Sequence, residues 1–227
     1  ILGKFPNENL SILLIDSTAY TKSVQLDSNR LVIRGFDSTM QNQEFKLIDL
    51  PSNRIIRKSY VVDFIDNSGG FSTDGSITYD KSTGRILFVE YFRNRIYCLD
   101  TNLNLLYSSH TIDTASSNSI EMRPMTVNDS ITKMVPSMAR KKVNSSVFSN
   151  EGSLYVVSEL RSDEQTIRQF NRNTVIDIYH TINGSYNGSI SIENVNDKKL
   201  KSCYIDKDTL YTLFENRLCR FVVKQKS

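Results

Sequence analysis

The residues best suited to bind an anion are basic ones that gather at two places. Two arginines flank Asn94 in a short polar turn, and paired guanidinium groups can hold a carboxylate or a phosphate. Other basic residues lie among methionines, whose flexible thioether suits an adaptable contact surface. The candidate binding residues are therefore Arg93, Asn94, Arg95, Arg123, Arg140 and Lys141. The alternatives are a solvated turn for the first group and, for the second, a lid that packs its methionines on the fold.

Catalytic and metal-binding patterns are weak in this sequence. The two histidines, His110 and His180, end similar phrases, so we place them at equivalent positions of separate repeats, with no third metal ligand beside them. Neither a P-loop, a dinucleotide-binding glycine pattern nor a G-x-S-x-G nucleophile motif occurs. Most aspartates flank expected strands, where Asp commonly caps turns. We therefore assign no catalytic residue, no metal ligand and no cofactor.

Composition narrows the class of partner. The chain has 227 residues and a formal charge of +3, with Lys and Arg scattered along it, so a nucleic-acid partner is not expected. Three cysteines without a CxxC spacing argue against a zinc site or a disulfide framework, and Cys98 and Cys219 are expected to be small core residues on strands. No apolar run resembles a membrane span, so membrane contact is expected only through an N-terminal anchor absent from this sequence.

The clearest secondary-structure pattern lies in residues 76–113. Runs of β-branched and aromatic residues alternate there with turn formers, which predicts strands at 76–79, 85–91, 95–99 and 105–112. The turn at 80–84 begins with Asp, which can bond its own backbone, and ends with Gly, which accepts a positive φ. Four such strands form an antiparallel meander with two apolar faces. A single meander cannot bury both faces, so it needs neighbours of its own kind.

Similar meanders recur along the chain. Residues 155–157 match 87–89, and residues 175–183 match 105–113 almost letter for letter; a truncated copy spans 203–223, and a weaker one spans 31–57. Repeated meanders of roughly 40–50 residues are typical of a β-propeller. We therefore predict an all-β protein, a single β-propeller domain over residues 1–227. A β-sandwich without repeats is the alternative.

Three segments fall outside this pattern. Residues 114–144 lack strand periodicity and contain Pro124 and Pro136, so we expect a long inter-blade insertion without regular strands. Residues 11–16 are apolar enough to form a strand. Residues 24–29 are expected to be a connection.

Several phrases resemble a family of uncharacterised Bacteroidetes proteins. They are Thr73-Asp74-Gly75, Tyr91-Phe92-Arg93-Asn94, the stretch 100–105, Thr111-Ile112-Asp113-Thr114 and the stretch 175–179. The resemblance implies a six-bladed propeller of the broad NHL and TolB-like type that is exported or membrane-anchored. It also implies an extracytoplasmic location, in the periplasm or the cell envelope, and carries over no catalytic residue.

These patterns favour a non-enzymatic binding or scaffold module for a protein, peptide or glycan partner. Propeller loops vary while the strands hold them rigidly, which suits such a role. The alternative is a lactonase- or lyase-like propeller enzyme with a metal or carboxylate site in its central channel. In that case acidic and His or Asn side chains from several blades would converge on one point.

Overall fold

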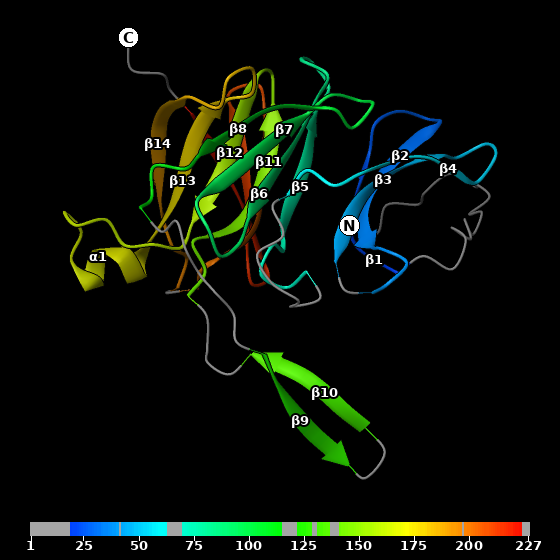
Figure 1. Cartoon of the computed structure of the whole chain (residues 1–227). Helices are drawn as coiled ribbons and strands as arrows, with labels where there is room; N and C mark the ends of the chain where they lie inside the picture. Colours follow the sequence, from blue (N-terminus) through cyan, green and yellow to red (C-terminus); the bar gives the residue numbers. More distant parts are fainter. Residues whose placement is uncertain are drawn as a thin grey trace.

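The computed structural model describes residues 19–40, 42–62, 70–114, 122–128, 131–136, 141–196 and 198–223. The strand predicted at 11–16 lies outside these residues. The strands are β1 (Tyr20–Gln25), β2 (Arg30–Phe36), β3 (Gln43–Asp49), β4 (Arg54–Ser59), β5 (Gly75–Asp80), β6 (Arg85–Glu90), β7 (Arg95–Leu99), β8 (Leu105–His110), β9 (Met122–Asn128), β10 (Ile131–Pro136), β11 (Asn144–Asn150), β12 (Ser153–Ser158), β13 (Asn173–His180), β14 (Tyr186–Glu193), β15 (Leu200–Asp206), β16 (Thr209–Phe214) and β17 (Arg217–Val222). One short helix, α1 (Ile167–Arg172), joins them (Figure 1).

The strands form antiparallel sheets in which neighbours in the sequence are neighbours in the sheet. We number these sheets as blades: blade 1 is β1–β4, blade 2 is β5–β8, blade 3 is β11–β14, and blade 4 is the three-stranded sheet β15–β17. The strands β9 and β10 pair separately as a hairpin. In blade 2 the predicted turn holds: Asp80 Oδ1 accepts the backbone N–H of Ser82 at 3.1 Å, and Gly84 has φ +65°.

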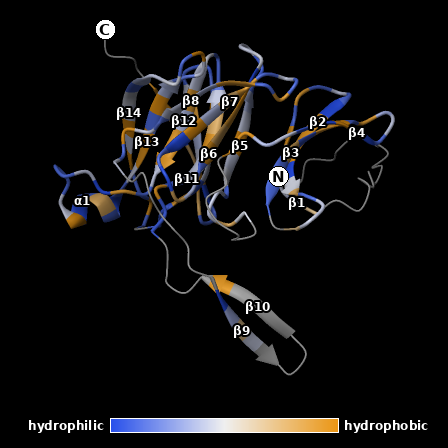
Figure 2. Cartoon of the chain, viewed as in Figure 1, coloured by the Kyte–Doolittle hydropathy of each residue, from blue (hydrophilic) through white to orange (hydrophobic). Residues whose placement is uncertain are grey.

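The blades stack side by side with their first strands together. β5 contacts β1 and β11, and β11 contacts β15, so the first strand of each blade is the inner one. Between β5 and β11 the hydroxyls of Thr78 and Ser149 lie 3.0 Å apart. Separate apolar cores fill the spaces between successive blades, and Figure 2 shows the apolar residues along their strands. This arrangement confirms the predicted β-propeller and excludes two facing sheets; the described part of the chain contains four blades, and a count of six stays a prediction.

Because the strands alternate in direction, their connections fall at two ends of the stack. The short turns 26–29, 50–53, 81–84, 100–104, 151–152, 181–185 and 207–208 share one end, which we call the turn end. The connections between blades and those between second and third strands share the other, which we call the loop end. The hairpin β9–β10 and the helix α1 both belong to the loop end (Figure 1). The variable parts of the chain are therefore collected on one side.

Two predicted details are wrong. The segment 114–144 contains the strands β9 and β10, although we expected no regular strands there, and Val24 belongs to β1, although we expected a connection. Methionine, proline and lysine give β9–β10 little strand propensity, so only the pairing between its two halves defines it.

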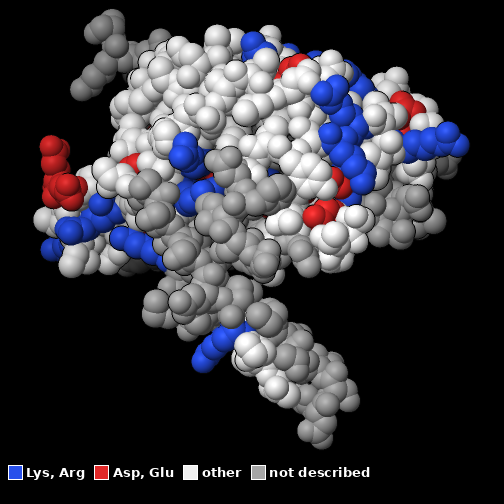
Figure 3. All heavy atoms as spheres, in the orientation of Figure 1, with Lys and Arg blue, Asp and Glu red and all other residues white. Residues whose placement is uncertain are grey.

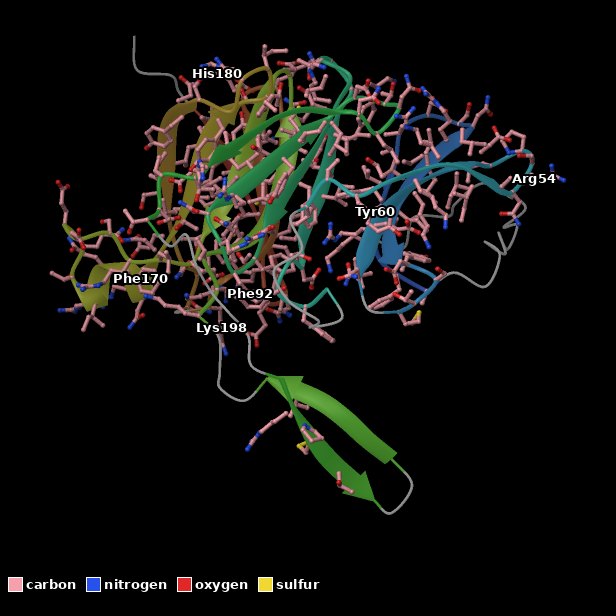
Figure 4. All side chains as sticks on the ribbon, in the orientation of Figure 1. Arg54, Tyr60, Phe92, Phe170, His180 and Lys198 are labelled. Atoms are coloured by element: carbon pink, nitrogen blue, oxygen red, sulfur yellow. The ribbon has the colours of Figure 1, made fainter. Side chains whose placement is uncertain are left out.

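The histidine positions are also not equivalent. His110 ends β8, the fourth strand of blade 2, at the loop end, whereas His180 ends β13, the third strand of blade 3, at the turn end. Figure 4 shows His180 at the end opposite Phe92. The repeated His-Thr-Ile sequence instead corresponds to the same kind of backbone hydrogen bond in both blades. After each strand the threonine N–H reaches a turn of the neighbouring strand: Thr111 bonds the Asn94 carbonyl, and Thr181 bonds the Gly152 carbonyl, each at 2.9 Å.

Candidate binding surface

A basic and aromatic surface lies at the loop end, where blades 1, 2 and 3 meet. We call it the loop-end patch and define it as Lys22, Tyr91, Phe92, Lys141 and Lys142. The Nζ atoms of Lys22 and Lys142 lie 5.4 and 5.0 Å from the centroid of the Tyr91 ring, on which Phe92 packs edge-on at 6.3 Å. Both distances suit cation–π attraction. The ring therefore gathers ammonium groups from two blades around one point.

The backbone beneath this patch is held by hydrogen bonds. The carbonyl of Tyr91 accepts the N–H groups of Val143 at 2.7 Å and Asn144 at 3.2 Å. The buried side-chain amide of Asn144 donates to the carbonyls of Glu90 at 2.9 Å and Arg93 at 3.1 Å. These bonds tie the β6–β7 turn of blade 2 to the start of β11 in blade 3. The aromatic residues of the patch therefore stand on a fixed base.

Arg93 already has an anion within the protein. Its Nε and one terminal nitrogen donate to both oxygens of the Glu90 carboxylate, and both side chains are buried. Burial raises the pKa of Glu90, although hydrogen bonds from Arg93 act to lower it. The solvated-turn alternative is therefore wrong for Arg93, which is only 5% exposed. Its role as a binding residue stays a prediction.

The other predicted binding residues are separated by the fold. Asn94 is buried and donates to the backbone carbonyl of Asp113 at 2.7 Å, so it holds the start of the insertion. Arg95 is half-buried on β7 and lies opposite His110 of β8 in the strand register. Arg123 is exposed on β9, and Lys141 is exposed just before β11. Arg140 lies outside the described residues. Of the set, only Lys141 belongs to the loop-end patch as defined.

One further arginine, Arg34, was not among the predicted binding residues. Its guanidinium lies 4.4 Å from the Phe88 ring and 5.0 Å from the Phe45 ring, and it donates to the carbonyl and hydroxyl of Thr73 at 3.0 and 2.9 Å. Burial lowers its pKa to about 10. Arg34 therefore joins blade 1 to the segment that leads into blade 2. Its position inside the apolar run 31–36 could have indicated this role, because a charged residue in a buried strand needs polar partners.

Two carboxyl groups on neighbouring blades, Asp113 just after β8 and Asp177 within β13, lie near enough for the charge of one to affect the other. Burial, reinforced by the charge of Asp177, raises the pKa of Asp113 to about 6, although Ser158 and Lys141 act to lower it. Burial also raises the pKa of Asp177, whose Oδ1 accepts the hydroxyl of Ser189 at 2.5 Å. The folded state therefore binds a proton at Asp113 more tightly than the unfolded chain does.

This pair predicts a measurable pH dependence. A group whose pKa is raised on folding contributes more stability as the pH falls through that pKa. The wild type should therefore gain stability relative to Asp113→Asn between pH 7.5 and pH 5. The gain over this pH range should be about 1 kcal/mol, because part of the stabilisation develops only below pH 5 and solvent screening reduces the rest. Urea unfolding of both proteins at both pH values measures it. Equal changes in the two proteins would contradict the assignment.

Within the described ranges, no group of three or more His, Cys, Asp or Glu side chains is placed to hold a metal ion. Asp74, at the entrance to β5, lies 3.6 Å from the Lys22 ammonium. No helix among the described residues has the length and apolar character needed to cross a membrane.

Comparisons with known proteins find similarity only among solved structures. No model of a protein family matches the sequence, and neither does a curated protein. Sqt1 of Saccharomyces cerevisiae is 10% identical, with a TM-score of 0.46 over 87% of this chain and 42% of its own. A member of the duf4221 family from Bacteroides vulgatus is 10% identical, with a TM-score of 0.43 over 98% of this chain and 61% of its own.

The β-propeller domain of the Trilobed protease from Pyrococcus furiosus is 8% identical, with a TM-score of 0.41 over 88% of this chain and 65% of its own. The structural neighbours thus include propeller proteins and one uncharacterised family from Bacteroides. The chain spans less than two thirds of the length of each of these three structures. At these scores the fold assignment depends on the sheet topology described above.

Proposed function

We propose that this chain is a non-enzymatic binding or scaffold module that acts outside the cytoplasm and holds a protein partner at its loop end. Peptides and glycans are the other partner classes considered from the sequence. A protein segment suits the surface better, since the loop-end patch combines ammonium groups with aromatic rings. Acidic side chains can pair with the lysines while apolar side chains pack on Tyr91 and Phe92.

The observation that carries this proposal is the hairpin β9–β10. It extends away from the blades on the loop-end side (Figure 1), and Figure 3 shows a basic side chain on it, apart from those over the sheets. Residues 123–126 are exposed, including the large apolar Met125. A two-stranded hairpin is at best marginally stable alone in water. A partner that covers its apolar side chains would stabilise it.

The position of the hairpin supports the same role. It belongs to the connection between β8 and β11, which also contains Lys141 and Lys142, and the ammonium of Lys142 lies over the Tyr91 ring. A partner that contacts the hairpin therefore meets the loop-end patch at its base. Rigid blades beneath a projecting element are the usual arrangement of a binding scaffold.

The test compares partner capture by three forms of the protein. One is the wild type, one carries Arg123→Glu, Lys141→Glu and Lys142→Glu, and one carries Arg54→Glu and Lys81→Glu, which are exposed basic positions of the turn end. Each is used as bait for native envelope extract, and captured proteins are quantified by mass spectrometry. The loop-end variant should lose a specific partner at least tenfold, because like charges then face it.

The turn-end variant is the matched control and should keep that partner. A second loop-end variant, in which a short Gly-Ser linker replaces residues 122–136, should lose the same partner without a change in thermal unfolding of the blades. An unchanged set of captured proteins for both loop-end variants would overturn the proposal.

A further inference from the structure

Four side-chain oxygens near the loop end of blades 2 and 3 are buried without a hydrogen-bond partner among the described residues. They are Asn94 Oδ1, Thr111 Oγ1, Asp113 Oδ2 and Asn144 Oδ1. The side chains of Asn94, Thr111 and Asn144 are almost wholly covered, with 7%, 4% and 1% exposed. A buried oxygen that has lost its water and gained no partner destabilises the fold, so such atoms usually indicate a bound water or ion.

Three of these oxygens come from blade 2 and the segment that leaves it. The side-chain amide of Asn94 donates to the backbone carbonyl of Asp113 at 2.7 Å. The unpaired Oδ1 of Asn94 is bonded to the same carbon as the donating nitrogen, so it also lies beside Asp113. The backbone carbonyl of Asn94 accepts the N–H of Thr111 at 2.9 Å, which extends the pairing of β7 with β8 by one step. Asn94 and Thr111 are therefore cross-strand neighbours.

Blade 3 supplies the fourth oxygen and closes the group. The side-chain amide of Asn144, the first residue of β11, donates to the carbonyl of Arg93 at 3.1 Å, next to Asn94 in the chain. Opposite Asn144 in the strand register is Ser158, whose hydroxyl bonds the Asp113 carboxylate and acts to lower the pKa of that group. Successive contacts thus lead from Asn94 through Asp113, Ser158 and Asn144 back to the start. We call Asn94, Thr111, Asp113 and Asn144 the interblade site.

The charges around the interblade site favour a cation. The carboxylate of Asp113 belongs to it, and Asp177 lies near enough for its charge to affect Asp113. Burial raises the pKa of both carboxyl groups, and a cation bound between the blades would offset that effect and keep them ionised. The positive charge that acts on Asp113 within the protein is Lys141, whose side chain is exposed to solvent. A water molecule would supply hydrogen bonds but no charge.

We propose that the interblade site binds one Ca²⁺ ion through the side-chain oxygens of Asn94, Thr111, Asp113 and Asn144, with water completing the coordination. Calcium takes six to eight oxygen ligands in irregular geometry, including amide carbonyls, whereas zinc prefers His and Cys. A single carboxylate ligand suits weak binding, with a dissociation constant of about 0.1–1 mM as in extracellular modules. The proposal is independent of a loop-end partner, because none of these residues belongs to the loop-end patch.

Isothermal titration of the full chain with CaCl₂ at pH 7.5, after treatment with a chelator, tests this proposal. The wild type should bind one calcium ion per chain, and its melting temperature should rise with calcium but not with the same concentration of MgCl₂. Asp113→Asn should weaken binding at least tenfold, because it removes the charged ligand. Asp163→Asn is the matched control: it removes the same charge from an exposed position between β12 and β13 and should bind calcium as the wild type does.

A second variant separates loss of a ligand from loss of the fold. Thr111→Val keeps the shape of the side chain and removes a hydroxyl that has no partner among the described residues, so the calcium-free protein should be at least as stable as the wild type. Its calcium affinity should nevertheless fall about threefold or more. Absence of saturable calcium binding by the wild type, an equal response to magnesium, or wild-type affinity in both Asp113→Asn and Thr111→Val would overturn the proposal and leave the site to water alone.

Discussion

Replacing Phe88 by alanine is expected to lower the free energy of unfolding by about 3–5 kcal/mol. Phe88 is fully buried on β6 in the core between blades 1 and 2. Its ring packs edge-on against Phe45 at 5.3 Å, and the Arg34 guanidinium lies over its face. Truncation leaves a cavity and removes one of the two aromatic surfaces that accommodate the buried charge.

Urea unfolding at neutral pH measures this effect. Ile182→Ala is the control, because Ile182 is 57% exposed in a turn-end connection and its loss should change stability by less than about 0.5 kcal/mol. If Phe88→Ala cost no more than the control, the core between blades 1 and 2 would not be as described. The melting temperature of the Phe88 variant should fall in parallel.

Replacing Arg93 by methionine is expected to cost about 3–5 kcal/mol, although the substitution is in a short turn. It keeps most of the side-chain volume and removes the charge, so the buried Glu90 carboxylate loses its closest cation. Asn144 still bonds the turn backbone, so the loss reports the ion pair.

The pH dependence of this loss provides a second measurement. Without Arg93 the pKa of Glu90 should rise further, so protonation relieves part of the penalty as the pH falls. The cost of Arg93→Met should therefore be smaller at pH 5 than at pH 7.5. Lys81→Met, at an exposed turn-end position, is the control and should change little at either pH. A cost below about 1 kcal/mol for Arg93→Met at both pH values would show that the pair is hydrated.

Much of the fold follows from local sequence chemistry. Runs of β-branched and aromatic residues between Asp- and Gly-containing turns predict the strands of blade 2 correctly, and the third strand of blade 4 carries Cys219 as expected. Cys98 is buried on the third strand of blade 2. These elements are readable because propensity, alternation and turn residues agree along the same stretch.

The incorrect predictions share a physical cause: the position of a segment in the fold is decided by the strands that pair with it, and not by its own residues alone. The segment that ends in His180 resembles β8, the outer strand of blade 2. In blade 3, however, β14 pairs on its far side, so this segment is the third strand β13 and not the outer strand. The helix α1, which we did not predict, lies in the connection between β12 and β13; the hydroxyl of Thr166 caps it by accepting the Gln169 N–H. Neither outcome can be read from residue type alone.

The candidate site was predictable only in part. Lys141 and Arg123 are exposed at the loop end, as a contact surface requires. The methionine-rich and basic composition of the segment around them is what indicated such a surface. Arg93 and Asn94 are buried because Glu90 and Asp113 lie beside them in space. Lys22 was missed because its contribution depends on β1 lying beside the Tyr91 ring of blade 2.

The radial arrangement of blades is the claim on which the site and both proposals depend, and a cysteine cross-link between inner strands tests it most directly. Thr78→Cys on β5 with Ser149→Cys on β11 should form a disulfide on mild oxidation, identified by peptide mass mapping, because these side chains touch. Thr78→Cys with Ser191→Cys on the outer strand β14 should not. Efficient cross-linking of the second pair and none of the first would contradict the propeller.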